Sequence, residues 1–185
     1  MRRSYGFTLI ELLVTITLAI ILCSFAFSSF TSLLKRLEAR NVAYGLQALV
    51  SASRNHALQL HQAITICGSS DTLHCDNNWS RGVLLMVDGN RNGVLEGNDR
   101  ILQFVEFNLD QAKLTWRGFS GNRVTIESFG TSFASNGTFT YCRTDDDPIY
   151  RRQVIINRSG RARVSHDTNG DGIDEDSNGN PISCP

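Results

Sequence analysis

The chain has 185 residues, of which 41% are hydrophobic and 19% are charged, and its 18 basic residues balance its 18 acidic residues. This length suits one domain with at most one appended element. The hydrophobic fraction is too high for a disordered chain and too low for a protein that crosses a membrane many times. Zero net charge excludes a protein that binds its partners through bulk charge alone.

The N-terminal segment is the most apolar part of the chain. Residues 12–34 form a run of 23 residues without a charge. A helix of this length spans the hydrocarbon core of a bilayer, which is about 30 Å thick. We therefore expect one membrane-crossing helix here. A removable secretory signal fits less well, because its apolar core is shorter and a small-residue cleavage site follows it.

The helical pattern continues beyond the apolar run. Between Val42 and Leu60, apolar and small residues recur at spacings of three and four, which is typical of an amphipathic helix. We therefore predict a single helix over residues 7–60, whose second half packs on a globular head. Two separate helices are the alternative, since Gly45 lies inside this range.

After Leu60 the pattern changes to short apolar runs between turn signals. Their length and their β-branched content predict strands. The expected strands cover residues 63–66, 82–87, 101–105, 123–126, 137–141, 153–156 and 161–164. The predicted fold class is therefore α+β, with a long N-terminal helix packed on an antiparallel β-sheet head.

The first residues carry a specific motif. A short basic leader with Arg2 and Arg3 ends at Gly6 and is followed by Phe-Thr-Leu-Ile-Glu, from Phe7 to Glu11. This segment resembles the processing site of type IV prepilins and of type II secretion pseudopilins. The resemblance implies that prepilin peptidase cuts after Gly6 and that the new N-terminus, Phe7, is methylated. It also implies that Glu11 pairs with the free N-terminus of a neighbouring subunit in the filament.

The resemblance divides the chain into a leader peptide (1–6), a transmembrane helix (7–30) and a periplasmic pilin-like head (31–185). The protein would be a single-pass protein of the inner membrane before it enters a pilus. Glu11 makes physical sense in this setting, because a carboxylate inside an apolar helix bundle needs a cation. Taken alone, Glu11 is equally compatible with a position at the membrane interface, facing headgroups.

Two segments of the head are similar to the FimT/GspH family of minor pilins. Residues 87–102 look like the family's Asp-x-Asn-x-Asn-Gly hairpin, and residues 160–163 look like the Gly-Arg-x-Arg element of its FimT-type members. The resemblance implies a minor type IV pilin that contributes to pilus assembly and binds double-stranded DNA without sequence preference during natural transformation. Its partners would be prepilin peptidase and other pilins. The alternative is a minor pseudopilin of a type II secretion system. We find no catalytic motif and expect no enzyme activity.

The DNA-binding candidates are five arginines within 13 residues that contain no acid: Arg151, Arg152, Arg158, Arg161 and Arg163. A guanidinium group binds phosphate oxygens with two parallel hydrogen bonds. Arg161 and Arg163 are two residues apart, so an extended strand would present both on one face. The alternatives are a solvated strand edge whose charges discourage pairing, and ion pairs with the acids at residues 145–147.

Five cysteines occur, and Cys23 lies in the apolar segment, where it acts as a small hydrophobic residue. The other four belong to the predicted exported head, where disulfides persist, and they allow three connectivities. We favour Cys67–Cys75, which closes a local loop, and Cys142–Cys184, which ties down the C-terminal tail. The alternative for part of this set is a zinc site made of His61, Cys67, His74 and Cys75. Its spacing matches no standard zinc module.

Two acidic runs have the spacing of calcium-binding loops. In residues 88–99 the flanks read as strands, so Asn-Gly hairpin chemistry explains that run more simply. The second run offers Asp167, Asn169 and Asp171 as calcium candidates, although it is equally compatible with a solvated acidic tail. We expect no other metal and no other cofactor.

Overall fold

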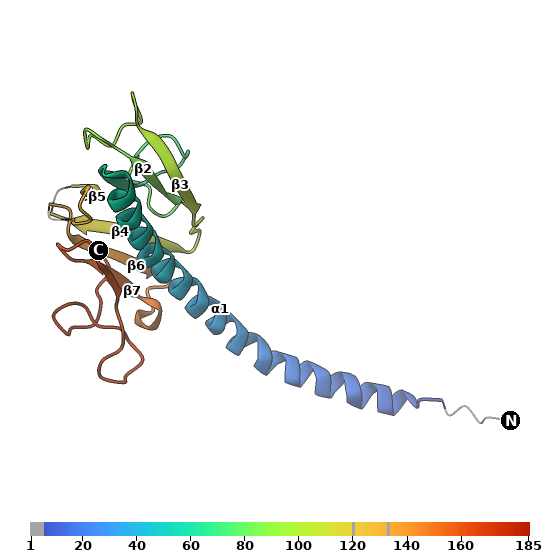
Figure 1. The fold of residues 1–185 in the computed structure, drawn as a ribbon. Coiled ribbons are helices and arrows are strands. Elements are labelled where there is room, and N and C mark those ends of the chain that lie inside the picture. Colours follow the sequence, from blue (N-terminus) through green and yellow to red (C-terminus); the bar gives the residue numbers. More distant parts are fainter. Residues whose placement is uncertain (1–5, 120, 133) are drawn as a thin grey trace. The chain divides into compact units, whose positions relative to one another are not determined.

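The computed structural model describes residues 6–119, 121–132 and 134–185, without the side chains of residues 24–29. The chain divides into two compact units, residues 1–38 and residues 39–185. The strands of the head all belong to the second unit (Figure 1). The leader arginines Arg2 and Arg3 lie outside the described residues.

One α-helix, α1 (Leu9–Leu60), accounts for 52 residues. The prediction of a single helix is confirmed, and the two-helix alternative is wrong because Gly45 is accommodated inside α1. The helix begins after Thr8, whose hydroxyl accepts a hydrogen bond from the main-chain N–H of Glu11 at 3.3 Å. A threonine cap followed three residues later by glutamate is a capping-box sequence. The Glu11 carboxylate in the first turn also stabilises the helix through its interaction with the positive end of the helix dipole.

No helix in the described part of the chain is both long enough and apolar enough to cross a membrane. The membrane-spanning segment that the sequence predicts at residues 7–30 therefore stays a prediction.

The head contains two four-stranded antiparallel sheets rather than one. The first has the order β3-β2-β1-β5 and the second β4-β6-β7-β8. The first sheet contains β1 (Ile64–Gly68), β2 (Gly82–Val87), β3 (Arg100–Glu106) and β5 (Arg123–Ile126). The second contains β4 (Ala112–Gly118), β6 (Gly137–Arg143), β7 (Arg152–Ile156) and β8 (Ala162–Val164), and a short 3-10 helix, η1 (Pro148–Tyr150), precedes β7. The expected antiparallel strands are confirmed, but β4 was not predicted.

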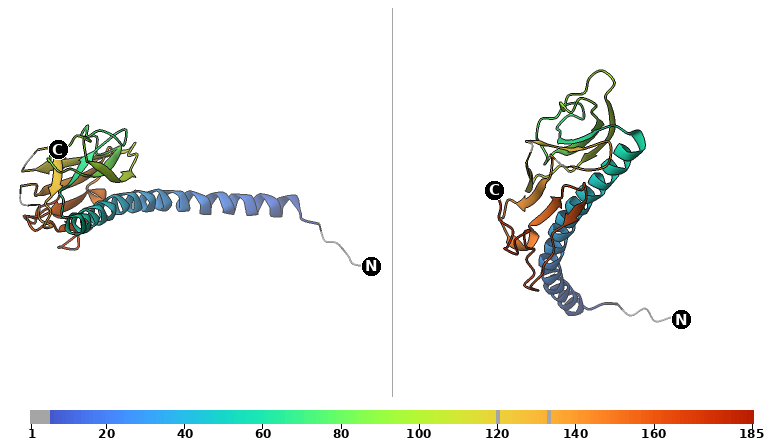
Figure 2. Two further views of the ribbon diagram at one scale, coloured as in Figure 1. Left: turned by 45° about the horizontal axis from the view of Figure 1, so that its top comes forward. Right: turned by 60° about the vertical axis from the view of Figure 1, so that its left-hand side comes forward.

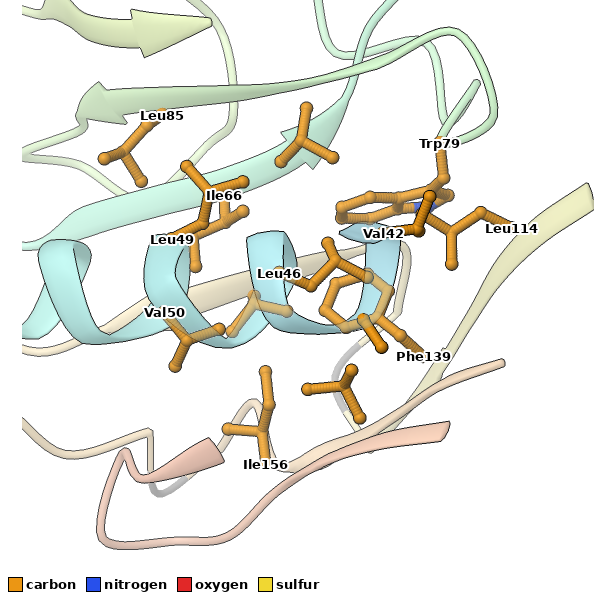
Figure 3. Packing of buried hydrophobic residues seen from close by; sticks show 14 of the residues in the cluster. Val42, Leu46, Leu49, Val50, Ile66, Trp79, Leu85, Leu114, Phe139 and Ile156 are labelled. Atoms are coloured by element: carbon orange, nitrogen blue, oxygen red, sulfur yellow. The ribbon is translucent and has the colours of Figure 1, made fainter. Parts of the chain in front are cut away.

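The second half of α1 runs along the head, and its apolar face packs against both sheets (Figure 2). In Figure 3, Leu46, Leu49 and Val50 of α1 lie between Ile66 of β1 on one side and Ile156 of β7 on the other. Leu46 is 1% exposed. The apolar spacing that predicted an amphipathic helix therefore corresponds to a stripe shared by two sheets.

An aromatic cluster joins the two sheets. Trp79, in the connection between β1 and β2, is buried, and its ring packs edge-on against Phe139 of β6 with 4.8 Å between the ring centroids. Trp116 of β4 lies 4.5 Å from the same Phe139 ring. This geometry adds to the stabilisation that burial provides. The cluster lies beside Val42 of α1 and connects the β1–β2 segment to the second sheet (Figure 3).

Candidate functional site

The predicted processing site lies just before α1. Gly6, Phe7 and Thr8 are outside the helix and exposed, and nothing within 4 Å would meet a Cβ atom on Gly6. The Phe7 side chain is 82% exposed. Proteases act preferentially on exposed, irregular backbone, and the Gly6–Phe7 bond lies in such a segment. Cleavage at this bond stays a prediction.

Glu11 lies in the first turn of α1 and is exposed. Among the described residues it has no ion-pair partner. Its surroundings on the N-terminal unit are apolar, because large hydrophobic side chains on this part of α1 are also exposed. They include Leu9, Ile10, Leu12, Leu13, Val14, Ile16, Leu18, Ile20, Ile21 and Leu22. An apolar surface of this extent indicates contact with lipid or with other helices.

Two of the five candidate arginines are engaged inside the protein. Arg151 donates to the main-chain oxygen of Ile182 at 2.9 Å and to the Asp146 carboxylate at 2.8 Å. Arg152 is 9% exposed, donates to two main-chain carbonyl groups, and lies 3.6 Å from the Asp174 carboxylate. Both guanidinium groups therefore hold the C-terminal segment in place, which speaks against contacts to an external partner.

The other three arginines are exposed at the β7–β8 hairpin. Arg158 lies in the turn, Arg161 immediately precedes β8, and Arg163 lies within β8, an edge strand of the second sheet. In the part of the chain that the structure describes, Arg161 and Arg163 form no ion pair. The alternative of ion pairs with the acids at residues 145–147 is thus observed for Arg151 and not for Arg161 and Arg163.

Arg161 lies beside α1 and next to a second arginine. It lines a depression of about 220 Å³ together with Ser51, Arg54, Asn55, Gly160 and Ala162. The Arg54 Nε group donates to the main-chain oxygen of Gly130 at 3.0 Å, which fixes the side chain against the head. Two guanidinium groups, a hydroxyl group and an amide group around one depression provide the donors that a phosphate needs.

Arg163 lies within β8, whereas Arg161 precedes this strand and lies beside α1, so the expectation that one strand presents both on one face is not met. The strand register aligns Arg163 with Ile155, Thr138 and Arg117 in one row across the second sheet. Phe139 and the other core residues alternate with this row, so the row lies on the sheet face turned away from α1. Arg117 is exposed and, at about 4.8 Å per strand, lies roughly 14 Å from Arg163 along the row.

The outer face of the second sheet is polar. A groove of about 340 Å³ there is lined by Thr115, Arg117, Thr138, Thr140, Gln153, Asp176, Ser177, Ser183, Cys184 and Pro185. Sequence reasoning missed Arg117 because it missed β4. The pattern that predicts a strand was nevertheless present, since residues 112–117 alternate strictly between apolar and polar side chains.

Both favoured disulfides are present, Cys67–Cys75 and Cys142–Cys184, with Cα–Cα distances of 5.5 and 6.0 Å. The zinc alternative is wrong, because disulfide sulfurs are not the thiolates that zinc binds. His74, which belonged to that alternative, instead bonds to the Asp71 carboxylate at 2.7 Å. This hydrogen bond, with two from main-chain N–H groups, holds the pKa of Asp71 well below its usual range.

The first acidic run forms the hairpin between β2 and β3, as its Asn-Gly sequence predicted. Asp88 is fully buried and accepts hydrogen bonds from the main-chain N–H groups of Asn92 and Gly93. The Glu96 carboxylate accepts from the side-chain amides of Asn90 and Asn92. The polar groups of this run therefore satisfy one another.

The second acidic run follows β8. It brings one ligand atom each of Asp167, Asp171 and Glu175 within 4.8 Å of one another. Asn169 lies in the same loop, and its amide nitrogen donates to the Asp171 carboxylate at 3.1 Å. The structure thus adds Glu175 to the three candidates that the spacing indicated.

Comparison with solved structures shows relatives of this fold. The type IV minor pilin FimU of Pseudomonas aeruginosa is 19% identical, with a TM-score of 0.56 over 71% of this chain and 90% of that chain. The minor pseudopilin EpsH from the type 2 secretion system of Vibrio cholerae is 16% identical, with a TM-score of 0.49 over 69% of this chain and 95% of that chain. No curated protein sequence matches the chain.

Family models match both parts of the chain. The model of the prokaryotic N-terminal methylation motif matches residues 1–27, where the sequence motif lies. The model of the type II transport protein GspH matches residues 43–160, which is more than half of the chain. The protein therefore belongs to the GspH family, whose members are structural pilins and pseudopilins and not enzymes.

Proposed function

We propose that this protein is a minor pilin that prepilin peptidase processes between Gly6 and Phe7 and that assembles into a type IV pilus, where its head binds double-stranded DNA. Before assembly it is anchored in the inner membrane by the first part of α1, with the head in the periplasm. DNA binding gives it a role in natural transformation. A minor pseudopilin of a type II secretion system is the alternative.

The exposed apolar side chains on the N-terminal unit support assembly. Residues such as Leu9, Ile10 and Leu12 are more than half exposed, and covering them with lipid or with neighbouring helices removes apolar surface from water. Glu11 lies among them without an ion-pair partner in the described chain. A neighbour's terminal ammonium group, released by cleavage after Gly6, supplies the charge that this carboxylate needs. The two disulfides suit an oxidising compartment.

The arginines beside β8 carry the DNA-binding proposal. Arg161 and Arg163 are exposed and form no ion pair within the described residues, so binding phosphate breaks no existing interaction. Arg54 extends the cationic surface on the side of α1, and Arg117 extends it on the outer face of the second sheet. Contacts to phosphates position a duplex without reading its sequence, which suits the uptake of DNA of any sequence.

Fluorescence anisotropy with a labelled duplex, using the full chain in detergent micelles over a series of salt concentrations, tests this proposal. Four arginine–phosphate contacts predict a slope of log affinity against log salt of about −3.6. Replacing both Arg161 and Arg163 with alanine should reduce the slope to about −1.8 and abolish most binding at physiological salt. The melting temperature should stay nearly unchanged, because both side chains are exposed.

The matched control is Arg40→Ala with Arg100→Ala. Both residues are exposed and form no ion pair among the described residues, and this pair removes the same net charge at other positions. It should bind DNA almost as the unmodified chain does. Equal binding by the Arg161/Arg163 variant and the unmodified chain would contradict the proposal, and so would an absence of binding at low salt. Either result would favour the pseudopilin alternative.

A further inference from the structure

Three carboxylates converge in the loop that follows β8. The ligand atoms of Asp167, Asp171 and Glu175 all lie within 4.8 Å of one another. At this distance their negative charges repel, and within the described chain none of the three forms an ion pair with Arg, Lys or His. The cluster therefore lacks the positive charge that would balance it.

Glu175 is the most buried of the three acids. Its side chain is 95% buried, since its relative exposure is 5%. One carboxylate oxygen, Oε2, accepts from the main-chain N–H and the hydroxyl group of Thr168 at 2.7 and 2.6 Å. The other oxygen, Oε1, is buried and has no hydrogen-bond partner in the described structure. A buried carboxylate oxygen without a donor or a cation is strongly unfavourable.

The neighbouring acid, Asp174, differs from the three. Its carboxylate accepts a hydrogen bond from the buried Ser165 hydroxyl at 2.6 Å and lies 3.6 Å from Arg152. Asp174 is thus already paired on the side of the second sheet. Asp174 therefore has a cationic partner among the described residues, whereas the three converging acids have none.

The loop is already curved around these side chains. Asp167 accepts from the main-chain N–H groups of Gly170 and Gly172 at 2.6 and 2.8 Å, and Asp171 accepts from that of Ile173 at 2.8 Å. Gly172 has a φ of 89°, a left-handed conformation that glycine adopts without strain.

We propose that Asp167, Asp171 and Glu175 bind a calcium ion, with the Asn169 side-chain oxygen as a further donor. Every donor is an oxygen atom, which is the preference of calcium and not of zinc. Oxygen atoms that lie within 4.8 Å of one another can reach one ion, and calcium accepts the flexible, carboxylate-rich coordination that such a loop offers.

The sequence positions agree with this assignment. Asp167, Asn169 and Asp171 occupy the first, third and fifth positions of a calcium-loop pattern, Gly172 the sixth, and Glu175 the ninth. The ion gives the orphan Glu175 oxygen a partner and neutralises the cluster. It stiffens the segment between β8 and the Cys142–Cys184 disulfide, independently of whether the head binds DNA.

Isothermal titration calorimetry of the full chain in detergent, with calcium chloride and separately with magnesium chloride, tests the site. The unmodified chain should bind one calcium ion with a Kd of about 10⁻⁴–10⁻³ M, as extracellular calcium modules do, and magnesium more weakly. Asp171→Asn should weaken calcium binding about tenfold or more, because it removes one ligand charge. The new amide oxygen can still accept from the Ile173 N–H group, so the fold is preserved.

Asp110→Asn is the matched control, because Asp110 is exposed and lies outside the loop. It should bind calcium as the unmodified chain does. Calcium should also raise the melting temperature of the unmodified chain and of this control, but not that of Asp171→Asn. Glu175→Gln should lose binding too; where this variant does not fold, Asp171→Asn decides. No saturable binding at millimolar calcium, or equal affinity of Asp171→Asn and the unmodified chain, would overturn the proposal.

Discussion

The two disulfides should stabilise the head to different extents, because they close loops of very different length. Cys142–Cys184 joins residues 42 apart in the sequence, and Cys67–Cys75 joins residues 8 apart. In the chain-entropy relation, the loss of conformational freedom in the unfolded chain grows with the logarithm of loop length. At 25 °C the longer loop corresponds to about 4 kcal/mol and the shorter one to about 2.5 kcal/mol of unfolding free energy.

The comparison uses two double variants, Cys142→Ala with Cys184→Ala and Cys67→Ala with Cys75→Ala. They form a matched pair, because each replaces one buried and one half-buried cysteine and so loses similar packing. Urea unfolding of the full chain in detergent, followed by the fluorescence of Trp79 and Trp116, measures both free energies. The long-loop variant should lose roughly 1.5 kcal/mol more than the short-loop variant. Equal losses, or a larger loss for the short loop, would refute the reasoning from loop length.

Further predictions concern the N-terminus and the acidic loop. Mass spectrometry of the processed protein should find a chain that begins at methylated Phe7, and an uncut chain would argue against processing. Glu11→Ala should be cleaved normally but depleted from sheared pili; recovery equal to that of the unmodified protein would count against charge pairing. Asp167 should titrate below its ordinary value of 3.8 in a pH series of NMR spectra, because the Gly172 N–H group stabilises its charged form. This stabilisation is present above the ordinary pKa and is lost as the pH falls through the lowered one, so a pKa at or above 3.8 would contradict the hydrogen bond.

Much of the fold follows from local sequence. The spacing of apolar residues between Val42 and Leu60 predicted the amphipathic half of α1, because a helix repeats every 3.6 residues wherever it lies. The β-branched runs predicted strands of the head, because β-branched side chains fit the pleated surface of a strand. The processing motif at Gly6–Phe7 is likewise local, since it needs only a particular order of residues before a helix.

The division of the strands into two sheets was decided by tertiary structure. Neighbours in a sheet such as β1 and β5 are far apart in the chain, and no local pattern records which strands pair. The partners of the arginines depend on the same long-range contacts. Arg151 and Arg152 look like Arg161 in the sequence, yet the first two contact the C-terminal segment, whereas Arg161 lies beside Arg54.

The acidic loop shows the same division. The spacing of Asp167, Asn169 and Asp171 was enough to nominate a calcium loop, because ligand spacing in a tight loop is a local property. Glu175 could not be assigned from the sequence, which offers several acids nearby. Only packing decides that its carboxylate is buried with one oxygen unpaired while Asp174 pairs with Arg152. Local geometry thus determined which residues were candidates, and burial, which depends on the whole chain, determined which of them lack a partner.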